Sequence, residues 1–318
     1  MPLSHRRPLG SSGITVSDLS IGSWLTFEHL PRDTGVAILR RARECGIDFF
    51  DDARYDDRTG RAPIRTGYSE VVFGEIFRAA GIARDEVVVA NKAWLEFWPD
   101  QDIGAEVGGS LGRLGFDYLD LVYCAPPPAG LPVADLVEAF GRLLAAGRVR
   151  AWGVLNWTAG QLAEAGRACA GLGVAGPAAA QLPYSLVQRA SVENPEVAGV
   201  LRAERIGVVA SYVLAGGALT GKYSGGGAVG GRIAARVDDP GVRAALDAGA
   251  ALGDLGARIG ADPAALAIAF VLANPDVCSA LLGATSPAQV TANTRAHQVL
   301  STLDDDTLAA LRRIGAPG

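Results

Sequence analysis

The chain has 318 residues, of which 49% are hydrophobic and 20% charged, and its formal net charge is −5. This length and composition are typical of a globular protein with a large core. The acidic balance and the lack of a long basic block exclude a nucleic-acid groove and an anionic membrane surface as expected partners.

No apolar run reaches the roughly 18 residues of a membrane span, and the first residues, MPLSHRRPLGSSG, lack the apolar centre of a signal peptide. The cysteines are scattered, with neither a CxxC pair nor metal-ligand spacing, at Cys45, Cys124, Cys169 and Cys278. This distribution argues for a reducing cytoplasm and against a zinc site or a disulfide framework.

Short apolar runs alternate with amphipathic stretches along the chain. The runs predict strands at 19–23, 46–51, 87–92, 118–124, 150–154, 178–181, 206–211 and 278–283. The stretches between them have helical spacing, at 34–45, 69–80, 103–114, 133–147, 159–172 and 194–204. Gly46 stands at an expected helix end, and Asp262-Pro263 has the pattern of an N-cap followed by a first-turn proline.

Eight such strand–helix units predict an α/β fold, a single parallel (β/α)8 TIM barrel over residues 1–318. Its active site would lie at the C-terminal ends of the strands. A doubly wound open sheet is the alternative, weakened because no GxGxxG follows the first strand. No linker divides the chain, and the loops at 56–67, 125–132 and 224–239 are candidate lids or binding loops.

Two of the predicted strands end on charged residues. Asp51 follows one apolar run, Lys92 follows the next, and Tyr55 lies four residues beyond Asp51. Because an unpaired charge is costly to bury, such strand ends either open onto a site or are caps that face water. An acid, a phenol and an amine at one rim can form a proton-transfer group.

Residues 216–222, GGALTGK, nearly match a phosphate-binding P-loop, but Tyr223 stands where the motif needs serine or threonine. The turn and Lys222 can still hold a phosphate through backbone amides and an ammonium group. The alternative is a glycine-rich surface turn that carries a solvated lysine.

Polar residues cluster at a predicted helix start and at several strand ends. Thr285 and Ser286 open a helix on which Gln289 and Asn293 share a face, which is a candidate anion seat. The remaining polar positions suit a cofactor bound across a barrel mouth, although each alone is typical of a structural residue: Asn156, Gln181, Tyr184, Ser211 and Tyr212.

Eight sequence blocks, spread from Leu9 to about Leu300, resemble the aldo/keto reductase superfamily. They are most similar to its branch that contains the beta subunits of voltage-gated potassium channels. In order they read PLGSSGITVSDLSIGSW, GIDFFDDA, YSEVVFGE, VVVANKAW, LLAAGRVRAWGVLNW, QLPYSLVQR, LAGGALTGKY and GATSPAQVTAN. The resemblance implies a (β/α)8 barrel that binds extended NADPH without a Rossmann domain.

The resemblance also implies which residues contact NADPH. Asn156 and Gln181 would hold the carboxamide, and Tyr212 would stack on the nicotinamide ring. The other implied contacts are Ser23 and Trp24 from the first strand, Ser211, Leu214, Gly216 and Lys222 at the pyrophosphate, and Arg232, Thr285, Gln289 and Asn293 at the adenosine end. An arginine at the ribose phosphate favours NADPH over NADH.

The family's catalytic set of aspartate, tyrosine, lysine and histidine is incomplete in this chain. Asp51 and Lys92 match it. Tyr55 matches only with a one-residue deletion, because the family pattern is DTAxxY; without the gap, Asp56 would stand there.

The family's histidine lies five residues after the aspartate of the strand that begins at Asp120, and the chain has Ala125 at that place. The channel subunits carry asparagine there. Cys124 is adjacent, but alternation along a strand turns it to the opposite face. The loss of such a hydrogen-bond donor predicts weak reduction of simple aldehydes.

The expected function is an NADPH-dependent oxidoreductase that reduces an aldehyde, ketone or keto-sugar, with Tyr55 as the proton donor. Trp94, Trp98 and Ala125 would line a large apolar substrate pocket, although Phe97 and Trp98 could instead pack under a loop. The alternatives are an NADP(H)-binding redox-sensing subunit, and a non-redox epimerase or dehydratase that uses the cofactor transiently. The expected partner is a small carbonyl compound, a homo-oligomer is possible, and no metal is expected.

Overall fold

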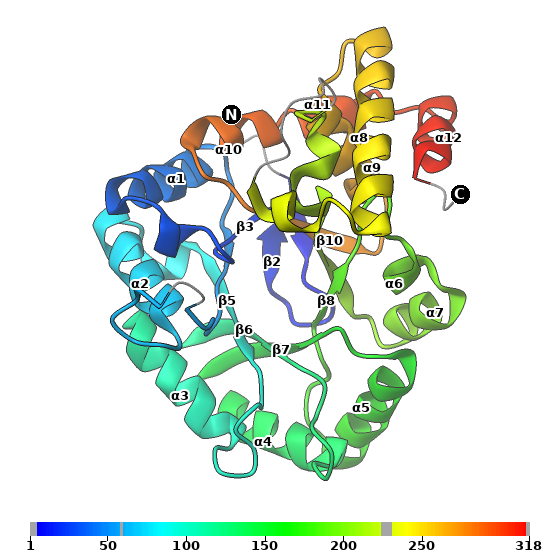
Figure 1. Ribbon diagram of the computed structural model, residues 1–318. Helices are drawn as coiled ribbons and strands as arrows, with labels where there is room; N and C mark the ends of the chain where they lie inside the picture. Colours follow the sequence, from blue (N-terminus) through cyan, green and yellow to red (C-terminus); the bar gives the residue numbers. More distant parts are fainter. Residues whose placement is uncertain (1–4, 58–59, 224–230, 316–318) are drawn as a thin grey trace.

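Eight parallel strands close into a barrel in the order β10-β3-β4-β5-β6-β7-β8-β9 (Figure 1). The computed structural model describes residues 5–57, 60–223 and 231–315. The barrel strands are β3 (Leu19–Gly22), β4 (Phe49–Asp51), β5 (Val88–Ala93), β6 (Leu119–Cys124), β7 (Val149–Leu155), β8 (Ala179–Pro183), β9 (Gly207–Ser211) and β10 (Val277–Leu282). The predicted TIM barrel is confirmed, and each predicted strand segment overlaps one of these strands.

Helices surround the barrel, as Figure 1 shows. The predicted ones correspond to α1 (Arg32–Glu44), α2 (Tyr68–Ala80), α3 (Ile103–Leu114), α4 (Val133–Ala145), α5 (Ala159–Leu172) and α7 (Pro195–Ala203). The others are α6 (Ala190–Glu193), α8 (Pro240–Ile259), α9 (Pro263–Leu272), α10 (Pro287–Asn293), α11 (Ala296–Ser301) and α12 (Asp305–Ile314), with short 3-10 turns η1 (Phe27–His29), η2 (Arg84–Glu86), η3 (Ala215–Thr220) and η4 (Gly231–Arg236). Asp262 caps α9 by accepting from the Ala264 N–H, as its sequence pattern predicts.

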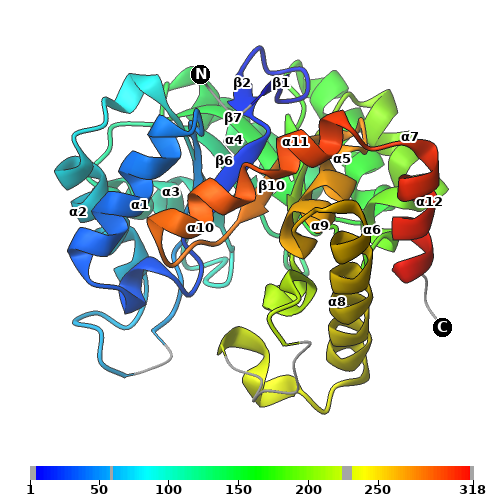
Figure 2. The same ribbon diagram turned by 90° about the horizontal axis from the view of Figure 1, so that it is seen from above.

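An antiparallel hairpin of β1 (Arg6–Pro8) and β2 (Thr15–Ser17) covers the amino-terminal end of the barrel (Figure 2). Gly10 in its turn has φ 53°, and a Cβ there would lie 2.1 Å from the Ala178 carbonyl oxygen. Only glycine allows this approach. The hairpin closes the end opposite the strand ends that carry the predicted site.

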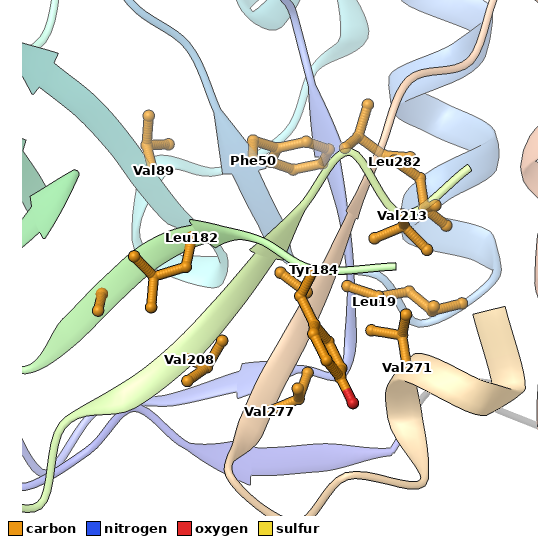
Figure 3. Packing of buried hydrophobic residues seen from close by; sticks show 14 of the residues in the cluster. Leu19, Phe50, Val89, Leu182, Tyr184, Val208, Val213, Val271, Val277 and Leu282 are labelled. Carbon is orange, nitrogen blue, oxygen red and sulfur yellow. The ribbon is translucent and has the colours of Figure 1, made fainter. Parts of the chain in front are cut away.

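The strands bury two separate apolar layers. Outward side chains pack against the helices, as Figure 3 shows for Leu19, Phe50, Val89, Leu182 and Val208. Inward side chains fill the barrel, among them Phe49, Val88, Ala90, Leu121, Tyr123 and Ala179. Because strand residues alternate between faces, Asp51, Lys92 and Gln181 share the inward face with their neighbours two residues earlier.

Among the described residues, no single helix has the length and apolar character to cross a membrane; α8 and α9 meet that test only together, and they are bent by 97°. All of the cysteines lie in the described ranges and are buried free thiols. Within those ranges, no group of three or more His, Cys, Asp or Glu side chains is arranged to hold a metal ion.

Candidate active site

A buried ion pair lies at the carboxyl-terminal end of the barrel. The Lys92 ammonium on β5 contacts Oδ1 of Asp51, the last residue of β4, and their side chains are only 4% and 2% exposed. Gln181 on β8 donates from Nε2 to Asp51 Oδ2 over 2.8 Å. Removal of one partner from such a buried pair typically costs about 3–5 kcal/mol, because it leaves the other charge uncompensated. The structure therefore brings together the two strand-end charges singled out in the sequence.

Tyr55 lies beside this pair in the loop after β4. Its ring centroid is 5.8 Å from Lys92 Nζ and 6.1 Å from the Trp94 ring centroid. The Tyr55 carbonyl accepts from the Gly67 N–H over 2.9 Å. Despite its short spacing from Asp51, the phenol is thus placed next to the ion pair.

Asp52 is a fully buried acid that the sequence reasoning missed. Its Oδ1 accepts from the Ser23 hydroxyl, and its Oδ2 has no hydrogen-bond partner among the residues described. Burial and the charge of Glu70 raise the pKa of Asp52 well above 3.8, against the opposing effects of Ser23 and Lys92. The available signal was the third aspartate in GIDFFDDA, which directly follows Asp51.

Tyr123, also missed, lies inside the barrel on β6. Its ring centroid is 5.9 Å from Lys92 Nζ, so Lys92 has phenol rings at nearly equal distances on two sides. Burial and the charge of Asp51 raise the pKa of Tyr123, which keeps its hydroxyl protonated. The alternation of β6 could have identified it, because it shares a face with Ala125.

Ala125 directly follows β6, where the alternation of the strand gives it the same face as Tyr123, and it is 8% exposed. Its N–H donates to the Ala93 carbonyl over 2.9 Å, which fixes the backbone there. Cys124 faces the helices instead, and burial raises the pKa of its thiol. Both placements agree with the alternation expected for this strand.

The aromatic residues after Lys92 do not form one surface. Trp94 packs against the barrel interior and lies beside Tyr55. Trp98 lies against the loop that follows β6, since a Cβ on Gly130 would be 3.6 Å from its ring. Phe97 is 49% exposed. Trp94 therefore lies nearest the ion pair, whereas Trp98 packs against the loop at 125–132.

The predicted nicotinamide residues lie at neighbouring strand ends. Asn156 follows β7, is exposed and has φ 58°. Gln181 is 3% exposed, and Ser211 ends β9 half-buried. Tyr212 is 45% exposed, and its ring centroid is 5.8 Å from that of Trp24. Two amides and an open aromatic ring thus occupy adjacent positions on the rim.

The GGALTGK segment forms η3, with left-handed glycines at Gly216 (φ 68°) and Gly217 (φ 99°). A Cβ on Gly216 would lie 2.8 Å from Ile233 Cγ2. Leu214 precedes the turn and packs on the core, while Lys222 is exposed with Nζ 4.8 Å from the Tyr223 ring centroid. The turn is a tight 3-10 segment with an exposed ammonium beside it.

Ser286 caps α10 as predicted, and Pro287 is its first residue. The Gln289 side chain accepts from the Thr285 N–H over 2.7 Å and is exposed, whereas Asn293 is 7% exposed. The side chain of Arg232 and residues 224–230 of the predicted binding loop lie outside the described part of the chain.

Comparisons with known proteins agree with this architecture. The aldo/keto reductase family model matches residues 18–316. A probable voltage-gated potassium channel subunit beta from Oryza sativa subsp. japonica is 32% identical, over 96% of this chain and 95% of its own length. The corresponding protein from Arabidopsis thaliana is 31% identical with the same coverage, and a putative one from Schizosaccharomyces pombe is 28% identical over 97% and 92%. The chain therefore belongs to the aldo/keto reductase family.

Proposed function

We propose that this protein is an NADPH-dependent oxidoreductase that reduces the carbonyl group of an aldehyde, ketone or keto-sugar. The observation that carries the proposal is the buried Asp51–Lys92 pair with Tyr55 beside it at the barrel mouth. Family membership supports the oxidoreductase class. The substrate class rests on the chemistry of this group of residues.

The residues present fit a nicotinamide dinucleotide. Gln181 offers a buried amide at the rim, Tyr212 an open ring face, and the η3 turn a glycine cradle next to the Lys222 ammonium. Such a cofactor needs an amide for its carboxamide, an aromatic ring for its nicotinamide and a phosphate-binding turn for its pyrophosphate. Bound NADPH would supply the hydride. The preference for NADPH over NADH rests on Arg232 and stays a proposal.

In this proposal Tyr55 holds the proton that the carbonyl oxygen receives. The Lys92 cation stabilises the phenolate that remains, and Asp51 keeps Lys92 in place. Gln181 fixes the second oxygen of Asp51, so the carboxylate cannot rotate freely. The low exposure of the pair strengthens its electrostatic effect on the phenol, because the local dielectric is low.

The substrate would lie against Trp94 and Ala125. Alanine leaves room and gives no hydrogen bond to the oxygen that becomes negative, so Tyr55 is its proposed donor. An apolar wall favours a bulky substrate whose binding energy compensates for the missing donor. Trp98 would contact the substrate only if the substrate extends to the loop at 125–132.

Steady-state NADPH oxidation with a panel of aldehydes, ketones and keto-sugars tests the proposal, with product identified by mass spectrometry. We expect turnover of at least one bulky member. Lys92→Met should lower kcat by about 10²-fold or more, since the proton donor loses its stabilising cation. Tight NADPH binding with no turnover of any compound would contradict an enzymatic role.

A regulatory subunit is the second candidate, because the relatives above are named as channel beta subunits. The sequence resemblance also places the family histidine at Ala125, which cannot donate a hydrogen bond from its side chain. In that case NADP(H) would remain bound through purification and no carbonyl compound would be consumed. Assembly into a homo-oligomer also stays a proposal, which light scattering of the purified protein would decide.

A further inference from the structure

Arg54 is a buried cation immediately before Tyr55, and it joins two loops of the barrel mouth. Its side chain is 5% exposed. Nη1 contacts Glu96 Oε1 at 2.7 Å and donates to Thr66 Oγ1 over 3.0 Å. Nη2 contacts Glu106 Oε1 at 3.2 Å. A guanidinium group suits such a role, because its donors form a rigid planar fork.

Glu106 on α3 carries this connection into the loop after β5. It accepts from the Trp94 N–H over 2.8 Å and from the Leu95 N–H over 3.0 Å. Leu95 has φ 58°, a left-handed conformation that is costly for leucine and needs support from its surroundings. The Glu106 carboxylate provides that support.

The Arg54 guanidinium also lies 5.0 Å from the Phe97 ring centroid, so this ring screens it from solvent. Burial alone lowers the pKa of Arg54, but the hydrogen bonds and charges of Glu96 and Glu106 raise it overall. The cation is therefore permanent. Its Nε has no hydrogen-bond partner in the described part of the chain.

The connection reaches Tyr55, which lies beside the ion pair, and Trp94, which lies beside Tyr55. Tyr55 is covalently next to Arg54, Trp94 is hydrogen-bonded to Glu106, and the Tyr55 and Trp94 rings are 6.1 Å apart. Thr66 lies at the far end of the 56–66 segment, where it pairs with Asp56. One side chain thus links both ends of that segment to the Trp94 loop.

We propose that Arg54 is a positioning residue that holds Tyr55 and Trp94 against Lys92 by bridging Glu96, Thr66 and Glu106. This inference rests on the proposed function. It explains how a tyrosine only four residues after Asp51 is placed beside Lys92. Arg54 acts through its neighbours, since its guanidinium group donates hydrogen bonds to Glu96, Glu106 and Thr66.

The test compares Arg54→Met and Arg54→Lys with the wild-type protein. Arg54→Met should lower kcat by about 10- to 100-fold, because a displacement near 1 Å is enough to cost that much. The Kd for NADPH should stay unchanged, since the proposed cofactor residues lie on other strands. Arg54→Lys keeps the positive charge but lacks the planar fork of the guanidinium group. Its kcat should therefore lie between those of Arg54→Met and the wild-type protein.

Arg84→Met is the matched control. Arg84 likewise forms an ion pair with a buried acid, since its Nη2 lies 2.7 Å from Oδ2 of Asp120 near the amino-terminal end of β6, and its own side chain is 18% exposed. Its loss should affect thermal stability without changing kcat. If Arg54→Met fails to fold, Glu96→Gln weakens the same bridge at a residue whose side chain is 46% exposed.

A second readout does not depend on activity. Loss of the bridge should speed tryptic cleavage after Arg61 and Arg65, because the segment loses its anchor at Thr66. If the wild-type protein shows no turnover, the proposed function is wrong. The tryptic cleavage rate still tests whether Arg54 anchors the segment that contains Arg61 and Arg65. A folded Arg54→Met protein with the kcat and cleavage rate of Arg84→Met would overturn the inference.

Discussion

We propose that Ala125 takes the place of the histidine in the family's catalytic set. It is buried and directly follows β6, two residues beyond Tyr123. Its methyl group offers no donor to a reacting oxygen. The proposed chemistry therefore depends on one phenol, which makes the position a direct test of transition-state stabilisation.

Ala125→His should raise kcat for small aldehydes by about 10-fold or more, because one oxyanion donor is typically worth 10²–10³ in rate. Steady-state NADPH oxidation with a short aldehyde measures the change. Ala125→Leu adds similar bulk without a donor and should give no gain. Equal rates for all three proteins would show that the oxygen needs no second donor at this place.

Asp52 predicts how stability depends on pH. Because its pKa is raised in the folded state, the native protein keeps a proton that the unfolded chain loses above about pH 4. Its contribution to stability is therefore present at low pH and is lost as pH rises toward the folded pKa. A single pKa unit corresponds to about 1.4 kcal/mol.

Asp52→Asn has no such proton to lose. Its Tm relative to wild type should increase steadily from pH 4 to pH 8, as measured by thermal unfolding at each pH. Asp247→Asn, at an exposed position on α8, should follow the wild-type curve. Parallel curves for Asp52→Asn and wild type would mean that the buried acid is not protonated in the folded state.

For single residues, the sequence predicts which charged side chains belong to the site better than it predicts which groups each of them contacts. Asp51 and Lys92 are recognisable because charged residues end apolar strands. Arg54 and Glu106 are not, since their meeting depends on the path of two loops and on burial that no local pattern encodes. Asp52 can be read from the sequence, but the rise of its pKa follows only from its burial beside Glu70.

Among the elements, the η3 turn is where backbone conformation bears most directly on the proposed cofactor site. Gly216→Ala would place a Cβ 2.8 Å from Ile233 Cγ2 at φ 68°. Left-handed backbone costs about 1–2 kcal/mol in a non-glycine residue, and the turn must also shift. We expect a lower Tm and roughly 10-fold weaker NADPH binding by fluorescence titration.

Gly253→Ala on α8 controls for the substitution itself. Its Cβ would meet no atom within 4 Å, and alanine should favour the helix by up to about 1 kcal/mol. NADPH affinity should stay at the wild-type level. If Gly216→Ala binds NADPH as tightly as Gly253→Ala, the turn is not part of the cofactor site.

Elements differ in how much of them the sequence predicts. Every barrel strand was predicted, because buried parallel strands are continuous apolar runs between helical stretches. The run at 46–51 nevertheless forms a strand only from Phe49. Asp48, just before it, binds the hairpin instead, since its carboxylate accepts from the Ser17 N–H over 2.8 Å. The sequence analysis gives no residue range for any helix after residue 240. It identifies only the first residues of α9 and α10.

For the whole molecule, the order of strands and helices was enough to predict the closed barrel. The hairpin at its amino-terminal end was not predicted, because its short strands gain their stability from Leu9, Ile14 and Val16 packed against the barrel interior. We propose that residues 1–318 form one domain. A single cooperative unfolding transition is expected, with a Tm that rises on addition of NADPH.

The rate of carbonyl reduction by Tyr55→Phe, relative to wild type, shows whether Tyr55 supplies the proton. If it does, kcat should fall by about 10²–10⁴-fold, the usual contribution of a positioned general acid, and NADPH affinity should stay unchanged because the aromatic ring remains. A Tyr55→Phe protein that reduces the same substrate at the wild-type rate would show that the proton comes from another group.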